Sequence, residues 1–242
     1  AAPAGAVAGR NLAFFPARAG QVAVAGLPVE TPEGSLTVAV QAEVGAGEGQ
    51  RAVPLLATLQ VEAAGFPQRA LAVQRRYVEA PSPEVQRRIE DDRAAFARAF
   101  AQPEEPPLFH ASFAWPRRAR VTAGYGEQRT LNGVKPSQHY GLDLAGRVGA
   151  PVAAANDGRV VLVRDCWASG RTVILWHGGG LYTTYFHLSR AAVKEGQVLR
   201  RGQRLGQVGA TGRVSGPHLH WGVRVGDLYV DPRSVLRLRF PG

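Results

Sequence analysis

Residues 216–223 read GPHLHWGV, and this stretch decides which fold and chemistry are expected of the chain. The chain has only six histidines, yet His218 and His220 are separated by a single leucine. The alternation of residue types predicts a β-strand. Side chains two positions apart lie on one face of a strand, so both imidazoles can reach the same point. Alone, the pair fits either two solvent-facing strand residues or a metal site, and other segments have to decide.

Two further segments carry residues of the same kind. In QHYGLDLAG (138–146), His139 and Asp143 are four positions apart and share a face of either a strand or a helix. Gly141 favours the extended form and, lying on that same face, leaves it open for an ion. The segment YTTYFHLS (182–189) is strongly β-like and contributes His187. Two imidazoles and one carboxylate are a common donor set for catalytic zinc, with water in the fourth position.

These five candidates exceed what a single zinc ion needs, so we expect some of them to act on water or substrate instead. The helical H-E-x-x-H signature is absent, which excludes a thermolysin-like site. The loop GATGRVSG (209–216) superficially resembles a phosphate-binding loop but lacks the Lys-Ser/Thr ending. We interpret it as the bend that delivers the histidine pair.

The rest of the chain predicts a mainly β protein of three parts. Residues 1–81 alternate like short strands and predict a small antiparallel β-sandwich, with no histidine or aspartate in residues 12–80. Residues 82–111 predict one amphipathic helix, N-capped by Ser82, followed by a proline-rich joint. Residues 112–242 return to a β pattern with many turn signals. The short joint leads us to expect that the N-terminal part and the helix pack against this last domain and restrict its cleft.

The charge of the chain is unevenly distributed. Residues 1–110 hold 10 arginines and 12 acidic residues, whereas residues 111–242 hold 17 arginines, 2 lysines and 7 acidic residues. The C-terminal domain therefore carries a net charge of +12, which indicates contact with a polyanion. Nucleic acid, anionic lipid and anionic cell-wall polymer all fit. No zinc-finger, helix-turn-helix or RNA-recognition signature accompanies the charge, so we expect no nucleic-acid partner.

The composition also bears on location. No apolar run approaches the ~18–20 residues that a membrane span needs, so we expect none. The start AAPAGAVAG, without methionine, is typical of a processed chain whose export signal has been removed. Cys166 is the single cysteine, so no internal disulfide can form. The oligomeric state is open, with a monomer favoured.

The order of the motifs resembles a known family. HYGLD, then YFHLS, then G-x-x-G-x-x-x-GPHLH follow one another as in the zinc metallopeptidases of the lysostaphin/LytM type, which cut peptide cross-links of bacterial peptidoglycan. Flanking phrases such as GYGEQR, GAPVAAANDGRVV and DPRS match as well. The resemblance covers residues 118–235. More weakly, the preceding part resembles the N-terminal region of periplasmic members.

The resemblance implies a C-terminal antiparallel β-sheet peptidase domain that holds one Zn²⁺ per chain. His139, Asp143 and His220 would ligate the ion, and His187 and His218 would be the catalytic histidines. Their division of labour stays open. Tyr125 or Tyr185 is a candidate to bind substrate through its hydroxyl, with core packing as the alternative.

The function implied is a zinc-dependent endopeptidase that hydrolyses peptidoglycan cross-links in the periplasm or outside the cell. The cross-link itself stays open between a D-alanyl-diaminopimelate link and a glycine bridge. A catalytically silent relative that regulates an amidase is the alternative. The complete set of five residues speaks against it, because degenerate relatives lose them.

Overall fold

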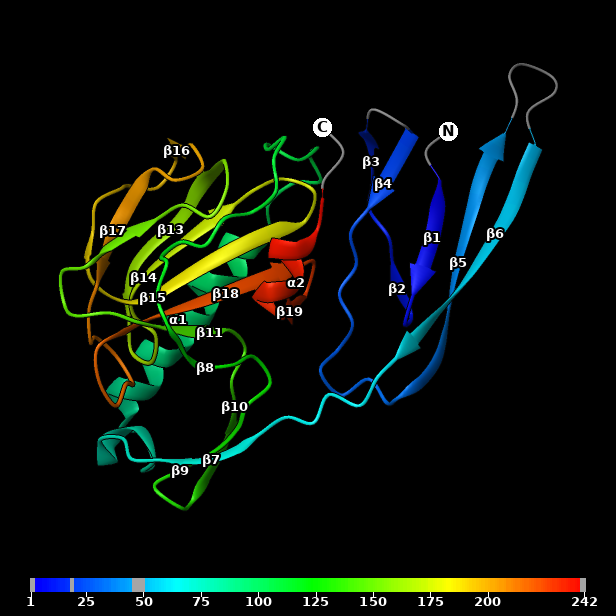
Figure 1. Ribbon diagram of the computed structural model, residues 1–242. Helices are drawn as coiled ribbons and strands as arrows, with labels where there is room; N and C mark the ends of the chain where they lie inside the picture. Colours follow the sequence, from blue (N-terminus) through cyan, green and yellow to red (C-terminus); the bar gives the residue numbers. More distant parts are fainter. Residues whose placement is uncertain (1–2, 18–19, 45–50, 240–242) are drawn as a thin grey trace.

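The computed structural model describes residues 3–17, 20–44 and 51–239 of the chain (Figure 1). Strands form most of the regular structure, which confirms the prediction of a mainly β protein. Two α-helices accompany the strands in the described ranges. Neither has the length and apolar character that crossing a membrane requires.

The N-terminal region is an antiparallel sheet beside a two-stranded ribbon. The sheet has the order β2 (Arg10–Asn11), β1 (Ala4–Val7), β5 (Gly34–Val44), β6 (Arg51–Val61), and the ribbon pairs β3 (Phe14–Ala17) with β4 (Gly20–Ala23).

The strands of this region are antiparallel as expected, yet few of its side chains are enclosed between layers. Of the side chains described before residue 62, Val7 and Phe15 are the apolar ones that are buried. On β6, Leu55 is 53% exposed and Leu56 is 73% exposed. The region is therefore an open sheet and ribbon with a thin core. Arg10 ties it to the C-terminal domain by an ion pair to Asp227, 3.2 Å long.

The segment after β6, which the sequence groups with residues 1–81, pairs with strands of the C-terminal part of the chain. Strand β7 (Gln68–Leu71) pairs in parallel with β9 (Gln128–Leu131), and β9 forms a hairpin with β10 (Lys135–Gln138). Figure 1 shows this cyan segment running from the N-terminal sheet to the far end of the other domain. A 3-10 turn, η2 (Arg75–Tyr77), follows where the alternating pattern had predicted a strand.

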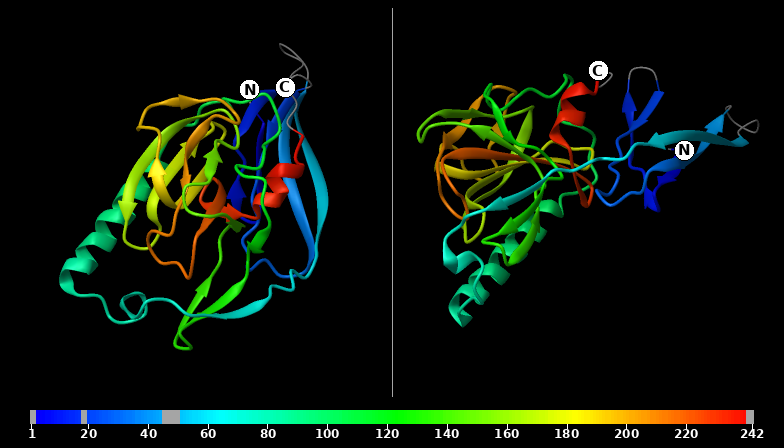
Figure 2. Two further views of the ribbon diagram at one scale, coloured as in Figure 1. Left: turned by 60° about the vertical axis from the view of Figure 1, so that its left-hand side comes forward. Right: turned by 60° about the horizontal axis from the view of Figure 1, so that its bottom comes forward.

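The predicted helix forms as α1 (Pro83–Phe100). The Ser82 hydroxyl accepts a hydrogen bond from the Val85 N–H (3.3 Å), and Pro83 occupies the first turn. Ala95 and Ala99 are buried against the C-terminal sheet, in a cluster that includes Ile174, Trp176 and Tyr182. Figure 2 shows the helix lying along this domain. The helix is therefore part of the C-terminal domain rather than a free connector.

The C-terminal domain is built on a ten-stranded antiparallel sheet, which confirms the predicted architecture. Its strands are β8 (Val121–Ala123), β11 (Leu142–Ala145), β12 (Pro151–Ala153), β13 (Gly158–Cys166), β14 (Gly170–Trp176), β15 (Leu181–Ala191), β16 (Val198–Leu199), β17 (Arg204–Val208), β18 (His218–Val225) and β19 (Leu228–Val230). The main path runs β16-β13-β14-β15-β18-β11-β8. A short helix, α2 (Pro232–Arg237), is capped by the Asp231 carboxylate and closes the domain.

The alternation of the central strands explains how this sheet presents polar groups. On β11 and β18, the apolar residues Leu142, Leu144, Leu219 and Trp221 are fully buried. The register between these strands places Asp143 directly opposite His220. Burial of one face therefore sets which side chains gather on the other.

Candidate metal centre

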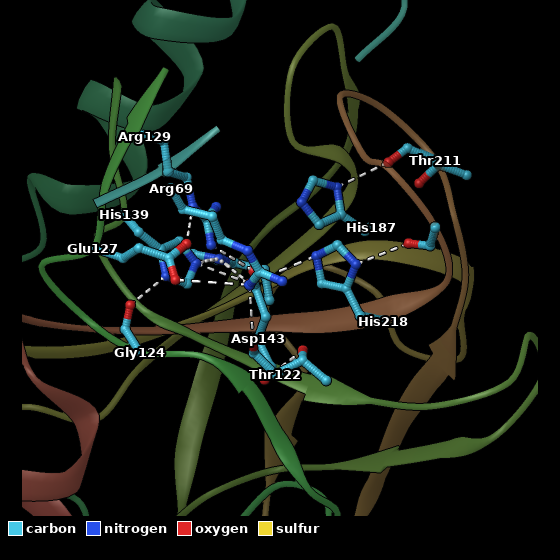
Figure 3. A network of polar contacts seen from close by, with 12 residues as sticks. Arg69, Thr122, Gly124, Glu127, Arg129, His139, Asp143, His187, Thr211 and His218 are labelled. Carbon is cyan, nitrogen blue, oxygen red and sulfur yellow. Dashed lines mark hydrogen bonds and ion pairs between the residues drawn. The ribbon is translucent and has the colours of Figure 1, made fainter. Parts of the chain in front are cut away.

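Three side chains converge where β11 and β18 meet. Asp143 Oδ1 lies 2.9 Å from His139 Nε2 and 3.0 Å from His220 Nδ1, and these two nitrogens lie 2.9 Å apart (Figure 3). All three residues are buried. The structure thus brings together the three ligands implied by the resemblance.

The donor set fits a cation. His139 Nδ1–H donates to the Gly124 carbonyl (2.6 Å), which fixes the ring with Nε2 directed at the other two donor atoms. Burial lowers the pKa of His220 to about 4, so this ring is neutral near pH 7 and can act as a ligand. Three short contacts converge between these atoms, and one ion among them satisfies all three donors. Donors this close leave a point about 2.0–2.2 Å from each of them, the length of zinc–ligand bonds.

The carboxylate of Asp143 stays ionised. Burial raises its pKa, but the adjacent His139 and His220 imidazoles outweigh burial and hold the pKa well below the usual range. The second carboxylate oxygen, Oδ2, accepts a hydrogen bond from Arg129 Nη2 at 2.9 Å. Arg129 is itself held by Glu127, whose Oε1 lies 2.7 Å from Nε. Groups of this kind orient metal ligands.

The sequence alone did not indicate a role for Arg129 or Glu127. Both lie in the GYGEQR phrase, which the resemblance included without assigning a role. Their charge and spacing are ordinary for exposed strand residues. Only the fold of the β9–β10 hairpin over the end of β11 brings Arg129 to Asp143.

Gly141 makes room for a ligand ring rather than for the ion. A Cβ at this position would lie 2.6 Å from the Trp221 carbonyl oxygen and 2.7 Å from His220 Nε2. The expectation that glycine opens this face holds, but the imidazole of His220 fills the space.

Changing Gly141 to alanine is therefore expected to displace the His220 ring and weaken zinc binding by ~10- to 100-fold, as for other changes that misorient a ligand. Competition with a chromophoric zinc chelator measures this. Gly124→Ala is the matched control, because its Cβ would meet only Arg233 at 3.8 Å and its carbonyl still accepts from His139. Equal zinc affinity in Gly141→Ala and the unaltered chain would contradict the steric argument.

His218 and His187 lie next to the donor set without joining it. His218 Nε2 is 3.5 Å from Asp143 Oδ1, and the two catalytic candidates have ring centroids 5.0 Å apart. Each donates its Nδ1–H to a backbone carbonyl at 2.8 Å, His218 to Gly216 and His187 to Thr211 (Figure 3). The Nδ1 atom of each ring is therefore committed, and Nε2 is the ring nitrogen left for a proton transfer.

His187 is held in an unusual state. Its φ is +62°, a left-handed conformation that is rare for a non-glycine residue and is typical of functional sites. Burial, followed by the nearby His218 and His220, lowers the pKa of His187 well below its ordinary value. The imidazolium form of His187 is therefore disfavoured.

One cavity of about 390 Å³ contains these groups. The predicted residues that line it are His139, Asp143, His187, His218 and His220. Phe96 of α1 and Arg69, Leu71 and Val73 of the β7 segment form other parts of its wall. No residue of β1 to β6 that the structure describes lines the cavity. The N-terminal part contacts the C-terminal domain through Arg10 and Asp227. However, α1 and the β7 segment border the cavity, and the N-terminal sheet does not.

The two tyrosines do not lie where substrate binding would require. Tyr185 is fully buried, and its hydroxyl accepts from the Ala155 N–H (2.8 Å) inside the core. The Tyr125 hydroxyl donates to the Tyr229 carbonyl (2.7 Å). Neither lines the cavity, so the geometry agrees with the alternative of core packing, fully for Tyr185 and in part for Tyr125. Tyr140 lines it instead and is 41% exposed.

The two remaining histidines play no part in the site. His177 is buried and contacts the Asp157 carbonyl (2.6 Å) and the Thr183 hydroxyl (2.8 Å). His110 is exposed in the joint.

Fold and donor set together define a metallopeptidase domain. Residues 137–232, which lie in the C-terminal domain, match the model of Peptidase family M23.

Three similar proteins illustrate the relationship. A peptidoglycan DD-endopeptidase of Vibrio cholerae, ShyA, is 48% identical over 104 residues, which are 42% of this chain and 24% of that protein. A putative M23 peptidase of Pseudomonas aeruginosa superposes with a TM-score of 0.70 at 29% identity, covering 97% of this chain and 87% of that one. A zinc-containing peptidase of Vibrio cholerae gives a TM-score of 0.50 at 33% identity, covering 55% and 41%. The chain spans about a quarter of the length of the curated relatives that it matches.

Proposed function

We propose that the protein is a zinc-dependent endopeptidase that hydrolyses peptide cross-links of bacterial peptidoglycan. The observation that carries this proposal is the buried His139–Asp143–His220 triangle with two further imidazoles facing the same cavity. The match to Peptidase family M23 supports the reaction type. The names of the curated relatives, peptidoglycan DD-endopeptidases, support the substrate.

His139, Asp143 and His220 would hold the ion, which when bound supplies Lewis-acid chemistry that activates water and the scissile carbonyl. His218 lies nearest the donor set, and its bare Nε2 accepts the proton that the attacking water loses. His187, one ring away, is placed to return a proton to the leaving amine. Because burial and the neighbouring imidazoles disfavour the imidazolium form of His187, a proton that reaches this ring is readily passed on.

The environment of the enzyme follows from its substrate. Peptidoglycan lies outside the cytoplasmic membrane, so we propose a periplasmic or extracellular location. The net charge of +12 on residues 111–242 favours residence near an anionic wall polymer rather than on nucleic acid. We also propose that the chain acts as a monomer.

Purified protein loaded with zinc is expected to clear a suspension of bacterial sacculi, and a chelator is expected to stop the clearing. Readdition of zinc restores it, because the metal supplies the activation of water. Turbidity measures the rate and mass spectrometry of the products identifies the bond. Binding to sacculi without clearing, with zinc present at one ion per chain, would favour the regulatory alternative and overturn the enzymatic one.

A further inference from the structure

Three arginines from distant parts of the sequence line the catalytic cavity, namely Arg69, Arg129 and Arg213. The first two have acidic partners. Arg129 contacts both Glu127 and Asp143, and Arg69 lies 3.8 Å from Glu127 while donating to the Thr122 carbonyl (3.2 Å). Their charges are therefore compensated within the protein.

Arg213 differs from both. In the described parts of the chain, its guanidinium has neither a hydrogen-bond acceptor nor an ion-pair partner, although the residue is half-buried. Burial, and then the positive charge of Arg129, lowers the pKa of Arg213. A partly desolvated cation without a partner destabilises the folded protein, so another role has to account for its position.

The loop that carries Arg213 also organises the catalytic histidines. The Arg213 backbone N–H donates to the Ala168 carbonyl (2.7 Å), which attaches the loop to the turn between β13 and β14. Two positions earlier, the Thr211 carbonyl accepts from His187, and three positions later the Gly216 carbonyl accepts from His218. The bend that the sequence analysis assigned to delivering His218 thus also places a free guanidinium on the wall of the same cavity.

We propose that Arg213 is a specificity-determining residue that binds a free carboxylate of the substrate next to the scissile amide. The inference rests on the proposed function and narrows its substrate class. A D-alanyl-diaminopimelate link carries such a carboxylate on the carbon that bears the scissile nitrogen, whereas a glycine bridge has none. Guanidinium and carboxylate groups form strong, charge-assisted hydrogen bonds. The structure therefore favours the first kind of cross-link over the second.

Two synthetic cross-linked peptides test the inference, one with the free carboxylate and one with that group converted to the uncharged amide. The zinc-loaded chain is expected to cleave the carboxylate peptide ~10- to 100-fold faster in kcat/KM, the range for a hydrogen bond between charged groups. Arg213→Gln should lose this preference because its kcat/KM falls for the carboxylate peptide and stays unchanged for the amide peptide. Arg213→Lys should recover part of it. Arg200→Gln, at an exposed arginine outside the cavity, is the control for a lost charge.

Thermal unfolding of the same variants distinguishes a structural role. Arg213→Gln is expected to unfold at a temperature no lower than the unaltered chain, because it removes an uncompensated charge. An equal loss on both peptides, or no preference in the unaltered chain, would overturn the role of Arg213. If neither peptide is cleaved, the proposed function fails. Calorimetric binding of the carboxylate and amide peptides then decides the role of Arg213 separately, and equal affinities overturn it.

Discussion

Replacing His220 with alanine is expected to remove both the zinc ion and the activity. His220 supplies one of three donor atoms that lie within 3.0 Å of one another, and its ring stacks on Phe186 with the centroids 5.1 Å apart. Without it, two donors remain, which is fewer than the three protein ligands of catalytic zinc sites. Loss of the metal's contribution of several kcal/mol corresponds to a fall in kcat/KM of about 10³-fold or more.

Zinc content after dialysis, measured by atomic emission, and the rate of sacculus clearing are the two readouts. His110→Ala is the matched control, because His110 is exposed in the joint and belongs to neither the zinc ligands nor the catalytic pair. It should keep both the metal and the activity. A His220→Ala protein that retains one zinc ion per chain would show that His220 is not a ligand, and the role of the triangle would have to be abandoned.

Replacing His218 with alanine is expected to leave most of the zinc in place while removing most of the turnover. Its Nε2 is 3.5 Å from Asp143 Oδ1, and the triangle is complete without it. Its Nδ1–H is committed to the Gly216 carbonyl, so the bare Nε2 is available as a base. General acid–base groups contribute ~10²–10⁴-fold to rate, and we expect a loss in kcat of this order.

The contrast between the two variants is the informative result. His218→Ala with near-complete zinc and low kcat separates catalysis from metal binding, and a largely unchanged KM would place the loss in the chemical step. If zinc disappears from His218→Ala but stays in His220→Ala, the two histidines exchange roles. If His218→Ala turns over normally, His218 is not the base, and His187 is the remaining histidine of the described cavity wall that lies outside the triangle.

Much of the candidate site was predictable because local periodicity orients side chains. On β18, a two-residue repeat sends His218 and His220 to one face while Leu219 and Trp221 enter the core. On α1, the N-cap at Ser82 and the proline after it could be recognised in the sequence. The same rules do not predict what the hydroxyls of Tyr125 and Tyr185 contact. Tyr185 lies in a strand like its neighbours, and only packing shows that its hydroxyl faces the core.

The partner of the β7 segment was not predictable for a similar reason. Residues 68–71 lie in a stretch with strand-like composition, so the sequence groups them with the N-terminal region. Their partner is β9, which lies about 60 residues further along the chain and pairs with them in parallel. The helix shows the same limit. Its amphipathic pattern predicts a buried face, but the pattern does not say that Phe96 lines the cavity.

The sequence by itself determined the β character, the helix start and the five-residue constellation, because each depends on which residue types recur at fixed spacing within one segment. Only the tertiary structure decided that Arg129 holds Asp143 and that Gly141 makes room for the His220 ring. The same is true of Arg213, whose guanidinium at the cavity has no acceptor among the described residues. These features depend on contacts between segments far apart in the chain. Spacing within a segment fixes the face on which a side chain lies, whereas pairing and packing between segments fix what that side chain meets.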